Sequence, residues 1–119
     1  MNKFDFEKLE VYQKSLNFIN KIFNLFDNMP YRIQKSVGNN LLRASISIAT
    51  NLAEGSGRRG RKEKRQFFII SQGSTFECIP MITILFKNKK ISIETFKELY
   101  NDCYVISKMT GGLITRFSN

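Results

Sequence analysis

The feature that most constrains the fold of this chain is the spacing of its apolar residues, which recur every three or four positions. In the first segment this stripe consists of Leu9, Tyr12, Leu16, Ile19, Phe23 and Phe26. In the last segment it consists of Phe96, Leu99, Cys103, Ile106, Leu113 and Phe117. Steps of three and four place side chains on one face of a helix, whereas a strand would alternate in steps of two. The spacing therefore predicts a helix in each segment.

Three breaks divide the chain into four such segments, at residues 28–30, 55–60 and 87–90. Proline and clustered glycine disrupt helices through steric clash and backbone entropy. The apolar stripes of the two middle segments are Ile33, Val37, Leu41, Ile48 and Leu52, and then Phe67, Ile70, Ser74, Met81 and Leu85. We therefore expect an all-α four-helix bundle, in one domain that spans residues 1–119.

Two residues predict details of the last two helices. Pro80 lies inside the third segment, where a proline removes a helical hydrogen bond and crowds the preceding turn. We expect a kink or a break near Phe76. Ser92 precedes the last segment and is expected to cap that helix at its N-terminus.

The first segment carries more apolar surface than one stripe supplies. A second stripe beside the first consists of Val11, Phe18, Ile22 and Leu25. One interpretation is a single wide surface that faces the core. Because apolar patches of this size are uncommon on the surface of monomers, we expect instead that the second stripe forms contacts between subunits of a homo-oligomer.

The charge of the chain is strongly unbalanced, since nineteen Lys and Arg residues face ten Asp and Glu residues, for a net charge of +9. Such a field attracts polyanions or acidic proteins, although it can also serve solubility. Six of the cations fall within eight positions, namely Arg58, Arg59, Arg61, Lys62, Lys64 and Arg65. They lie at a Gly-rich turn that opens a helix, where backbone amides and Arg side chains together suit a phosphate.

This basic run is therefore the candidate nucleic-acid-binding site, and a merely solvated surface run is the alternative. A second group of cations, Lys87, Lys89 and Lys90, could extend the same surface.

A polar row on the second helix is the other candidate site, and it consists of Arg43, Ser47, Asn51 and Glu54. Apolar residues flank the row, so we expect it to be at least partly buried. If the turn centres near Gly60, antiparallel packing brings Arg43 towards Glu77 and Ser47 towards Gly73. We predict an Arg43–Glu77 ion pair within a structural polar network, with a ligand site around Arg43 and Glu54 as the alternative.

The sequence contains few of the residues and motifs that catalysis usually requires. The chain has no His and no paired Cys motif for zinc, and residues 55–57 lack the setting of a P-loop. We therefore expect no enzyme activity, no cofactor and no metal. Cys78 and Cys103 lie in apolar contexts and are expected as buried thiols in a reducing cytoplasm. We expect no signal peptide at the N-terminus and no membrane span, because no apolar run approaches the ~18 residues that a span needs.

The stretch from Leu41 to Arg58 resembles a bacterial four-helix-bundle family that includes proteins encoded in intervening sequences of large-subunit ribosomal RNA genes. The resemblance is most specific at Asn51 and at Glu54-Gly55, and it covers most of the chain. It continues through Lys62, Glu63, Phe67, Gly73, Ser74 and Glu77, and it includes the opening residues 6–13.

The resemblance implies an up-and-down bundle, often assembled as a ring-like homopentamer. It also implies a distant relation to the accessory protein of diversity-generating retroelements, a basic pentamer that contacts nucleic acid and a reverse transcriptase. This chain departs from the family pattern at Leu42, where the first of two arginines is usual, and at Ser45 and Pro80.

The function that we expect is a non-catalytic oligomeric bundle that binds RNA or DNA through phosphates, without reading base sequence. The alternative is a scaffold whose basic surface recruits an acidic protein, for example a reverse transcriptase. A third interpretation is an enzyme, which would have a deep pocket with converging ionisable groups around Glu54. The sequence does not name the nucleic acid or the protein partner.

Overall fold

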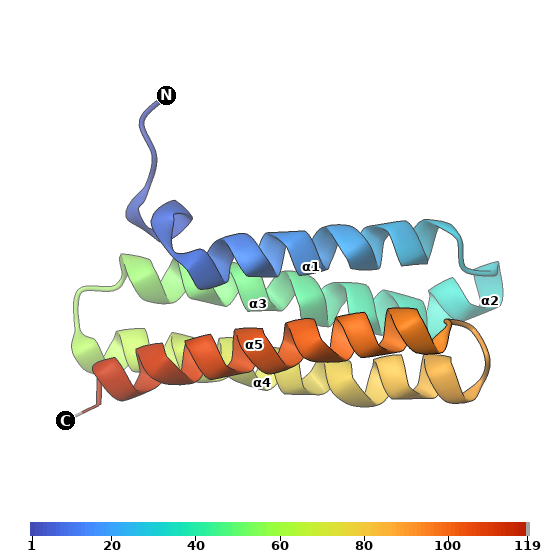
Figure 1. Cartoon of the computed structure of the whole chain (residues 1–119). Helices are drawn as coiled ribbons and strands as arrows, with labels where there is room; N and C mark the ends of the chain where they lie inside the picture. The colour runs from blue at the N-terminus through green and yellow to red at the C-terminus, as the bar shows by residue number, and fades with distance from the viewer. Residues whose placement is uncertain (119) are drawn as a thin grey trace.

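Four long helical segments run side by side and alternate in direction along the chain (Figure 1). The computed structural model describes residues 1–118. Within this part the helices are α1 (Glu10–Asp27), α2 (Tyr31–Ile33), α3 (Asn39–Gly57), α4 (Arg61–Lys87) and α5 (Ile93–Arg116). A 3₁₀ turn (Asp5–Lys8) precedes α1, and a π-helical segment (Gln34–Gly38) joins α2 to α3. The prediction of an all-α four-helix bundle is confirmed.

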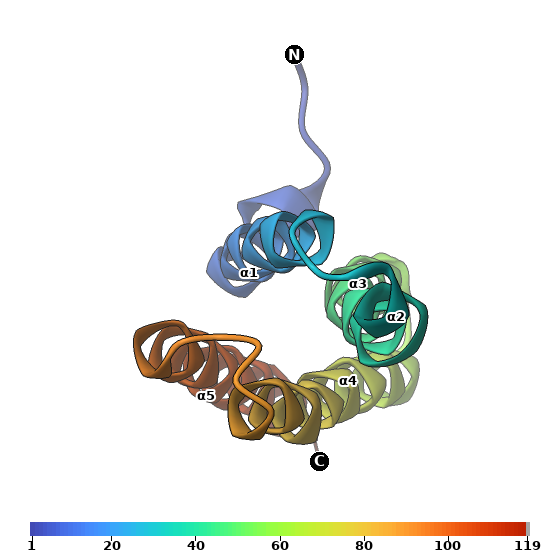
Figure 2. The same ribbon diagram turned by 90° about the vertical axis from the view of Figure 1, so that its right-hand side faces the viewer.

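The helices follow one another around the bundle in the order α1, α3, α4 and α5 (Figure 2). The pair α3 and α4 packs most extensively, and α4 packs next most extensively on α5. Contact between α1 and α5 is much sparser, so the bundle is least tightly closed along this seam. Short connections between antiparallel neighbours produce this arrangement.

The core face of α1 differs from the prediction. Val11, Phe18 and Ile22, which belong to the second stripe, are buried, whereas Phe23 of the first stripe is 43% exposed. The two stripes together form one wide surface whose middle faces the core. The second stripe of α1 is therefore not evidence for contacts between subunits. The reason given for expecting a homo-oligomer was wrong.

The second helical segment begins directly after Pro30 and reaches Gly57, beyond the start of the predicted break at residue 55. Two glycines in it allow close approaches. A Cβ atom at Gly38 would lie 2.9 Å from the sulfur of Met29, and one at Gly55 would lie 2.8 Å from the ring of Phe68. The α3 segment can therefore approach α4 closely at Gly55.

Helix α4 runs without interruption from Arg61 to Lys87, so the predicted break near Phe76 does not occur. Pro80 lies on the exposed side of the helix. Phe76 is also exposed, and water can therefore donate to the carbonyl group that Pro80 leaves without a helical partner. The core stripe of α4 also begins one residue later than predicted, because Phe68 is buried and Ile70 is 50% exposed.

The last helix matches its prediction more closely. The backbone N–H of Thr95 donates to Ser92 Oγ at 3.1 Å, which confirms Ser92 as the N-cap of α5.

Cys78 and Cys103 are both free and both buried, as expected. The neighbouring thiol of Cys103, together with burial, raises the pKa of Cys78 above its ordinary value.

One helix of the described residues, α4, is long and apolar enough to cross a membrane by length and composition, with a mean hydropathy of 1.4 over 18 residues. The expectation that no segment approaches this limit was therefore wrong, because Ser, Gln and Thr residues interrupt the apolar run without lowering its mean far enough. A core helix of a bundle passes the same test, and 39% of this window is buried in the bundle.

Candidate nucleic-acid interface

The basic run lies at one end of the bundle, in the connection after α3 and in the first turns of α4 (Figure 1). We call this region the basic end and define it by Arg58, Arg59, Arg61, Lys62, Lys64 and Arg65. The C-terminal ends of α3 and α5 lie at the same end of the bundle. Helix C-termini carry partial negative charge and favour cations, whereas the N-terminus of α4 carries partial positive charge.

Two cations of the basic end bind carbonyl groups at these C-termini. Lys64 Nζ donates to the carbonyl oxygen of Ser56 in the last turn of α3, at 2.8 Å. Arg61 Nη2 donates to the carbonyl oxygen of Arg116, the last residue of α5, at 2.6 Å. Carbonyl groups in the last turn of a helix have no helical donor. Arg61 and Lys64 therefore tie the N-terminus of α4 to the ends of α3 and α5.

Three cations lie close to the ring of Phe117. The charged groups of Arg61, Lys64 and Arg116 lie 5.3, 5.8 and 5.6 Å from its centroid. Cations within about 6 Å of a ring centroid are attracted by the negative face of the ring. Phe117 also contacts the buried ring of Phe68, at 5.9 Å between centroids. The positive charges at this end are thus held close together on a fixed support.

Arg58 has local partners. Its Nη2 donates to Glu54 Oε2 at 3.0 Å, and its guanidinium lies 4.7 Å from the ring centroid of Phe67. The two charged side chains are one helical turn apart and are both about half exposed. Glu54 therefore balances part of the charge of Arg58 and fixes its orientation.

Arg59 and Lys62 are the most available cations of the basic end. Both are exposed, and neither forms a hydrogen bond or an ion pair with residues 1–118. Arg65 is half-buried, and its Nε is buried without a hydrogen-bond partner in the part of the chain that the structure describes. A phosphate that approaches this end would thus meet Arg59 and Lys62 first.

The predicted polar row forms three separate contacts, two of which cross the seam between α3 and α4. The predicted ion pair is present, with Arg43 Nη2 2.9 Å from Glu77 Oε2. The pair is exposed, with 64% and 49% of the two side chains accessible, so the expected partial burial of the row does not extend to Arg43. They lie at the solvent edge of the seam.

The middle of the row is half-buried. Ser47 Oγ lies 2.8 Å from Ser74 Oγ, and Asn51 Nδ2 donates to Ser47 Oγ at 3.0 Å. The helices thus meet at Ser74, one residue beyond the expected Gly73, which is exposed. The third contact is the Glu54–Arg58 pair, so among residues 1–118 no continuous network links Arg43 with Glu54.

The second group of cations does not extend the basic end. Lys87, Lys89 and Lys90 lie where α4 ends, and the basic end lies where α4 begins (Figure 1). A helix of 27 residues separates the two groups by about 40 Å. The bundle therefore carries basic residues at both ends.

The surface near Glu54 has a wide, open depression lined by Thr50, Ala53, Glu54, Gly57 and Arg58. Its ionisable lining groups are Glu54 and Arg58, which pair with each other. Among residues 1–118, no three His, Cys, Asp or Glu side chains lie together in a way that would hold a metal ion.

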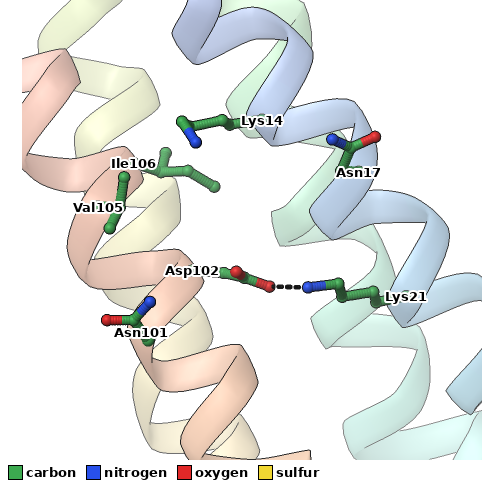
Figure 3. Close-up of a pocket in the computed structure, with 7 residues that line it drawn as sticks. All are labelled: Lys14, Asn17, Lys21, Asn101, Asp102, Val105 and Ile106. Carbon is green, nitrogen blue, oxygen red and sulfur yellow. Dashed lines mark hydrogen bonds and ion pairs between the residues drawn. The ribbon is translucent and has the colours of Figure 1, made fainter.

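A cleft between α1 and α5 was not anticipated from the sequence. It has a volume of about 160 Å³, and its polar lining includes Lys14, Lys21, Asn101 and Asp102 (Figure 3). Lys21 Nζ donates to Asp102 Oδ2 at 2.8 Å, across the seam where the bundle is least tightly closed. This hydrogen bond raises the pKa of Lys21, although partial burial opposes the shift. The pair therefore links α1 to α5.

The comparisons with known proteins agree with this architecture. A solved structure from Bacteroides thetaiotaomicron, described as a protein of unknown function from the S23 ribosomal protein family, has 25% sequence identity with this chain. The match covers 88% of this chain and 95% of that one, with a TM-score of 0.81. No curated protein matches the chain. The family model of the 23S rRNA-intervening sequence protein matches residues 7–112, and the chain therefore belongs to this family.

Proposed function

We propose that the protein binds RNA or DNA through phosphate groups at its basic end. The observation that carries this proposal is the position of Arg59 and Lys62, which are exposed beside two cations that backbone carbonyls hold in place. A fixed cluster of cations binds the nucleic-acid backbone by releasing its condensed counterions.

This surface offers contacts to the phosphate backbone of a nucleic acid. The amide groups in the first turn of α4 add donors that suit a phosphate. Phosphate contacts position a nucleic acid but carry no sequence information of their own. The proposed binding is therefore general, and the identity of the RNA or DNA would come from its shape or from another molecule.

We further propose that this role is non-catalytic and cytoplasmic. The acids that line the described clefts beside α3 and α5 are paired with cations, Glu54 with Arg58 and Asp102 with Lys21. Such pairing supports structural roles for these groups rather than proton transfer. Two free cysteines fit a reducing compartment.

The test is a salt titration of binding to a generic RNA duplex and to a generic DNA duplex. The variant is Arg59→Ala/Lys62→Ala, because these side chains hold no other described residue in place. The matched control is Lys87→Ala/Lys90→Ala, which removes the same charge at the other end of the bundle. With about five duplex contacts, the affinity of the wild type should fall roughly 500-fold between 50 and 200 mM salt.

With two of those contacts removed, the fall should be only about 40-fold, and the variant should bind more weakly at low salt. The control should keep the slope of the wild type. If the folded wild-type protein binds neither duplex at low salt, the proposal is wrong. The same exposed cations would then favour the alternative, a scaffold that recruits an acidic protein partner.

A further inference from the structure

The start of the second helical segment lies in a long stretch without acidic residues. Residues 28–53 contain no Asp and no Glu, and their cations are Arg32, Lys35 and Arg43. Arg43 is paired with Glu77. Arg32 and Lys35 are exposed, and their side chains form no hydrogen bond and no ion pair in the part of the chain that the structure describes. Both charges are therefore available to an anion.

An exposed aromatic ring lies beside these cations. The ring belongs to Tyr31, which is 72% exposed, and Lys35 Nζ lies 5.2 Å from its centroid. Tyr31 is the first residue of α2, directly after Pro30. Gln34 donates through its backbone N–H to the carbonyl oxygen of Pro30 at 3.0 Å, and through Nε2 to the carbonyl oxygen of Phe26 at 2.7 Å. The backbone that carries the ring is therefore tied to the end of α1.

The helix is irregular at this position. The π-helical segment Gln34–Gly38 follows α2, and Gly38 is its only buried residue. A Cβ atom at Gly38 would lie 2.9 Å from the sulfur of Met29, so the wide turn depends on the glycine to pack against the preceding loop. Turns of π-helix are rare and occur frequently at functional sites. An irregular turn that buries no large side chain therefore marks this exposed region as a candidate site.

We call this region the α2 tip and define it by Tyr31, Arg32 and Lys35. It lies at the end of the bundle opposite the basic end (Figure 1). Figure 2 looks onto this end and shows α2 over the end of α3, with no other helix in front of it. The helical residues 31–57 separate the α2 tip from the connection after α3 by about 40 Å. The α2 tip is therefore a surface separate from the basic end.

We propose that the α2 tip binds single-stranded RNA or DNA, with a base stacked on the ring of Tyr31 and with Arg32 and Lys35 at the adjoining phosphates. The observation that carries this inference is the exposed aromatic ring beside two cations that pair with no acid. Sites for single strands combine the same two components, a basic surface along the backbone and aromatic rings on which bases stack.

The ring favours a single strand over other anionic partners. In a duplex the faces of the bases are covered by neighbouring base pairs, whereas a single strand can present a base to a side chain. An acidic peptide would be attracted by the two cations but would not need the ring. The inference rests on the proposed function in one respect, since the ligand is again a nucleic acid, but it concerns a different surface and a different form of the strand.

The test measures the binding of a labelled oligouridylate of about 12 nucleotides, and of the matching oligothymidylate, by fluorescence anisotropy. The parent protein is Arg59→Ala/Lys62→Ala, so that phosphate binding at the basic end is weakened. On this parent, Tyr31→Ala removes the ring and Tyr31→Phe keeps it. The matched control is Tyr104→Ala, because Tyr104 is 55% exposed and has Lys108 Nζ 5.4 Å from its ring centroid, but lies in α5.

We expect Tyr31→Ala to lower the affinity for the single strands by between about 5-fold and 150-fold, which is the effect of one base stacked on an aromatic ring. Tyr31→Phe and Tyr104→Ala should bind like the parent. Because Tyr31 is exposed, all the variants should keep the helix content of the parent. The proposal is overturned if the parent binds neither strand, if Tyr31→Ala binds as tightly as the parent, or if Tyr104→Ala loses as much affinity. Competition by polyglutamate as strong as that by the unlabelled oligonucleotide would also overturn it, since charge alone would then explain the binding.

Duplex binding separates this inference from the proposed function. A Tyr31→Ala protein that retains Arg59 and Lys62 should bind both duplexes like the wild type. Failure at the α2 tip would then leave the proposal for the basic end in place. If the wild type bound no duplex while the parent bound single strands through Tyr31, the basic end would be excluded and the α2 tip would remain.

Discussion

Adding a methyl group at Gly55 tests how closely α3 and α4 approach each other. A Cβ atom there would lie 2.8 Å from Phe68 Cε1 and 3.0 Å from Phe67 Cβ. The ring of Phe68 is only 2% exposed, and Phe67 Cβ is attached directly to the backbone of α4. Neither atom can yield without moving the helix or the core around it. Gly55→Ala should therefore destabilise the protein.

The magnitude follows from two opposing contributions. Overpacking of a well-filled site costs typically about 1–3 kcal/mol. Replacing a helical glycine by alanine contributes about 0.5–1 kcal/mol in the other direction. We expect a net loss of about 0.5–2 kcal/mol for Gly55→Ala. Gly112→Ala carries only the second contribution, since its Cβ meets nothing within 4 Å, and it should stabilise the protein.

The assay is equilibrium unfolding in urea, with the midpoint compared at constant slope so that a change in the midpoint reports stability. The free energies of the two variants should differ by about 1–3 kcal/mol, because the helix contribution is common to both. A Gly55→Ala protein as stable as Gly112→Ala would refute the close contact between α3 and α4 at this position.

Three further predictions concern the polar contacts and the thiols. A double-mutant cycle on Arg43 and Glu77 should give a coupling of about 0–1 kcal/mol, because the pair is exposed; a coupling several times larger would show that the pair is shielded from water. The raised pKa of Lys21 means that the stability from its pair with Asp102 is fully present below the ordinary pKa of 10.5 and is lost as the pH rises through the folded-state value. Urea midpoints at rising pH should therefore fall more for the wild type than for Lys21→Met, and equal falls would contradict the pair. Both cysteines should resist a thiol reagent at neutral pH in the folded protein and react fully in urea, since burial protects them; rapid reaction before unfolding would show that the core is open.

The helical segments could be predicted from the sequence because period and breaks are local properties. The face of each helix that turns to the core is a property of its neighbours. In α1, two apolar stripes lie side by side, and periodicity alone cannot tell which one is centred on the core. In α4, Phe67 and Phe68 are both apolar, and only the packing of Phe68 under Gly55 selects it as the buried one.

The pair formed by Arg43 and Glu77 was predictable for a geometric reason, since equal distances from a tight turn place residues opposite each other in an antiparallel hairpin. The burial of that pair was not predictable, because a residue at the edge of a helix–helix seam has the same sequence spacing as a residue inside the seam. Lys21 and Asp102 lie on α1 and α5, which are 81 residues apart at this contact and have no common turn. No rule based on local spacing could have joined them.

The basic end shows how one set of residues combines structure with the proposed function. Six cations just before and at the start of α4 oppose the dipole of that helix, but the structure places them beside the C-termini of two other helices, which favour positive charge. Arg61 and Lys64 donate to carbonyls at those C-termini, so part of the basic run has a structural reason that is independent of any ligand. Arg59 and Lys62 have no such contact within residues 1–118. The case for nucleic-acid binding therefore rests on these two residues, and replacing them separates recognition from stability more cleanly than removing the whole run.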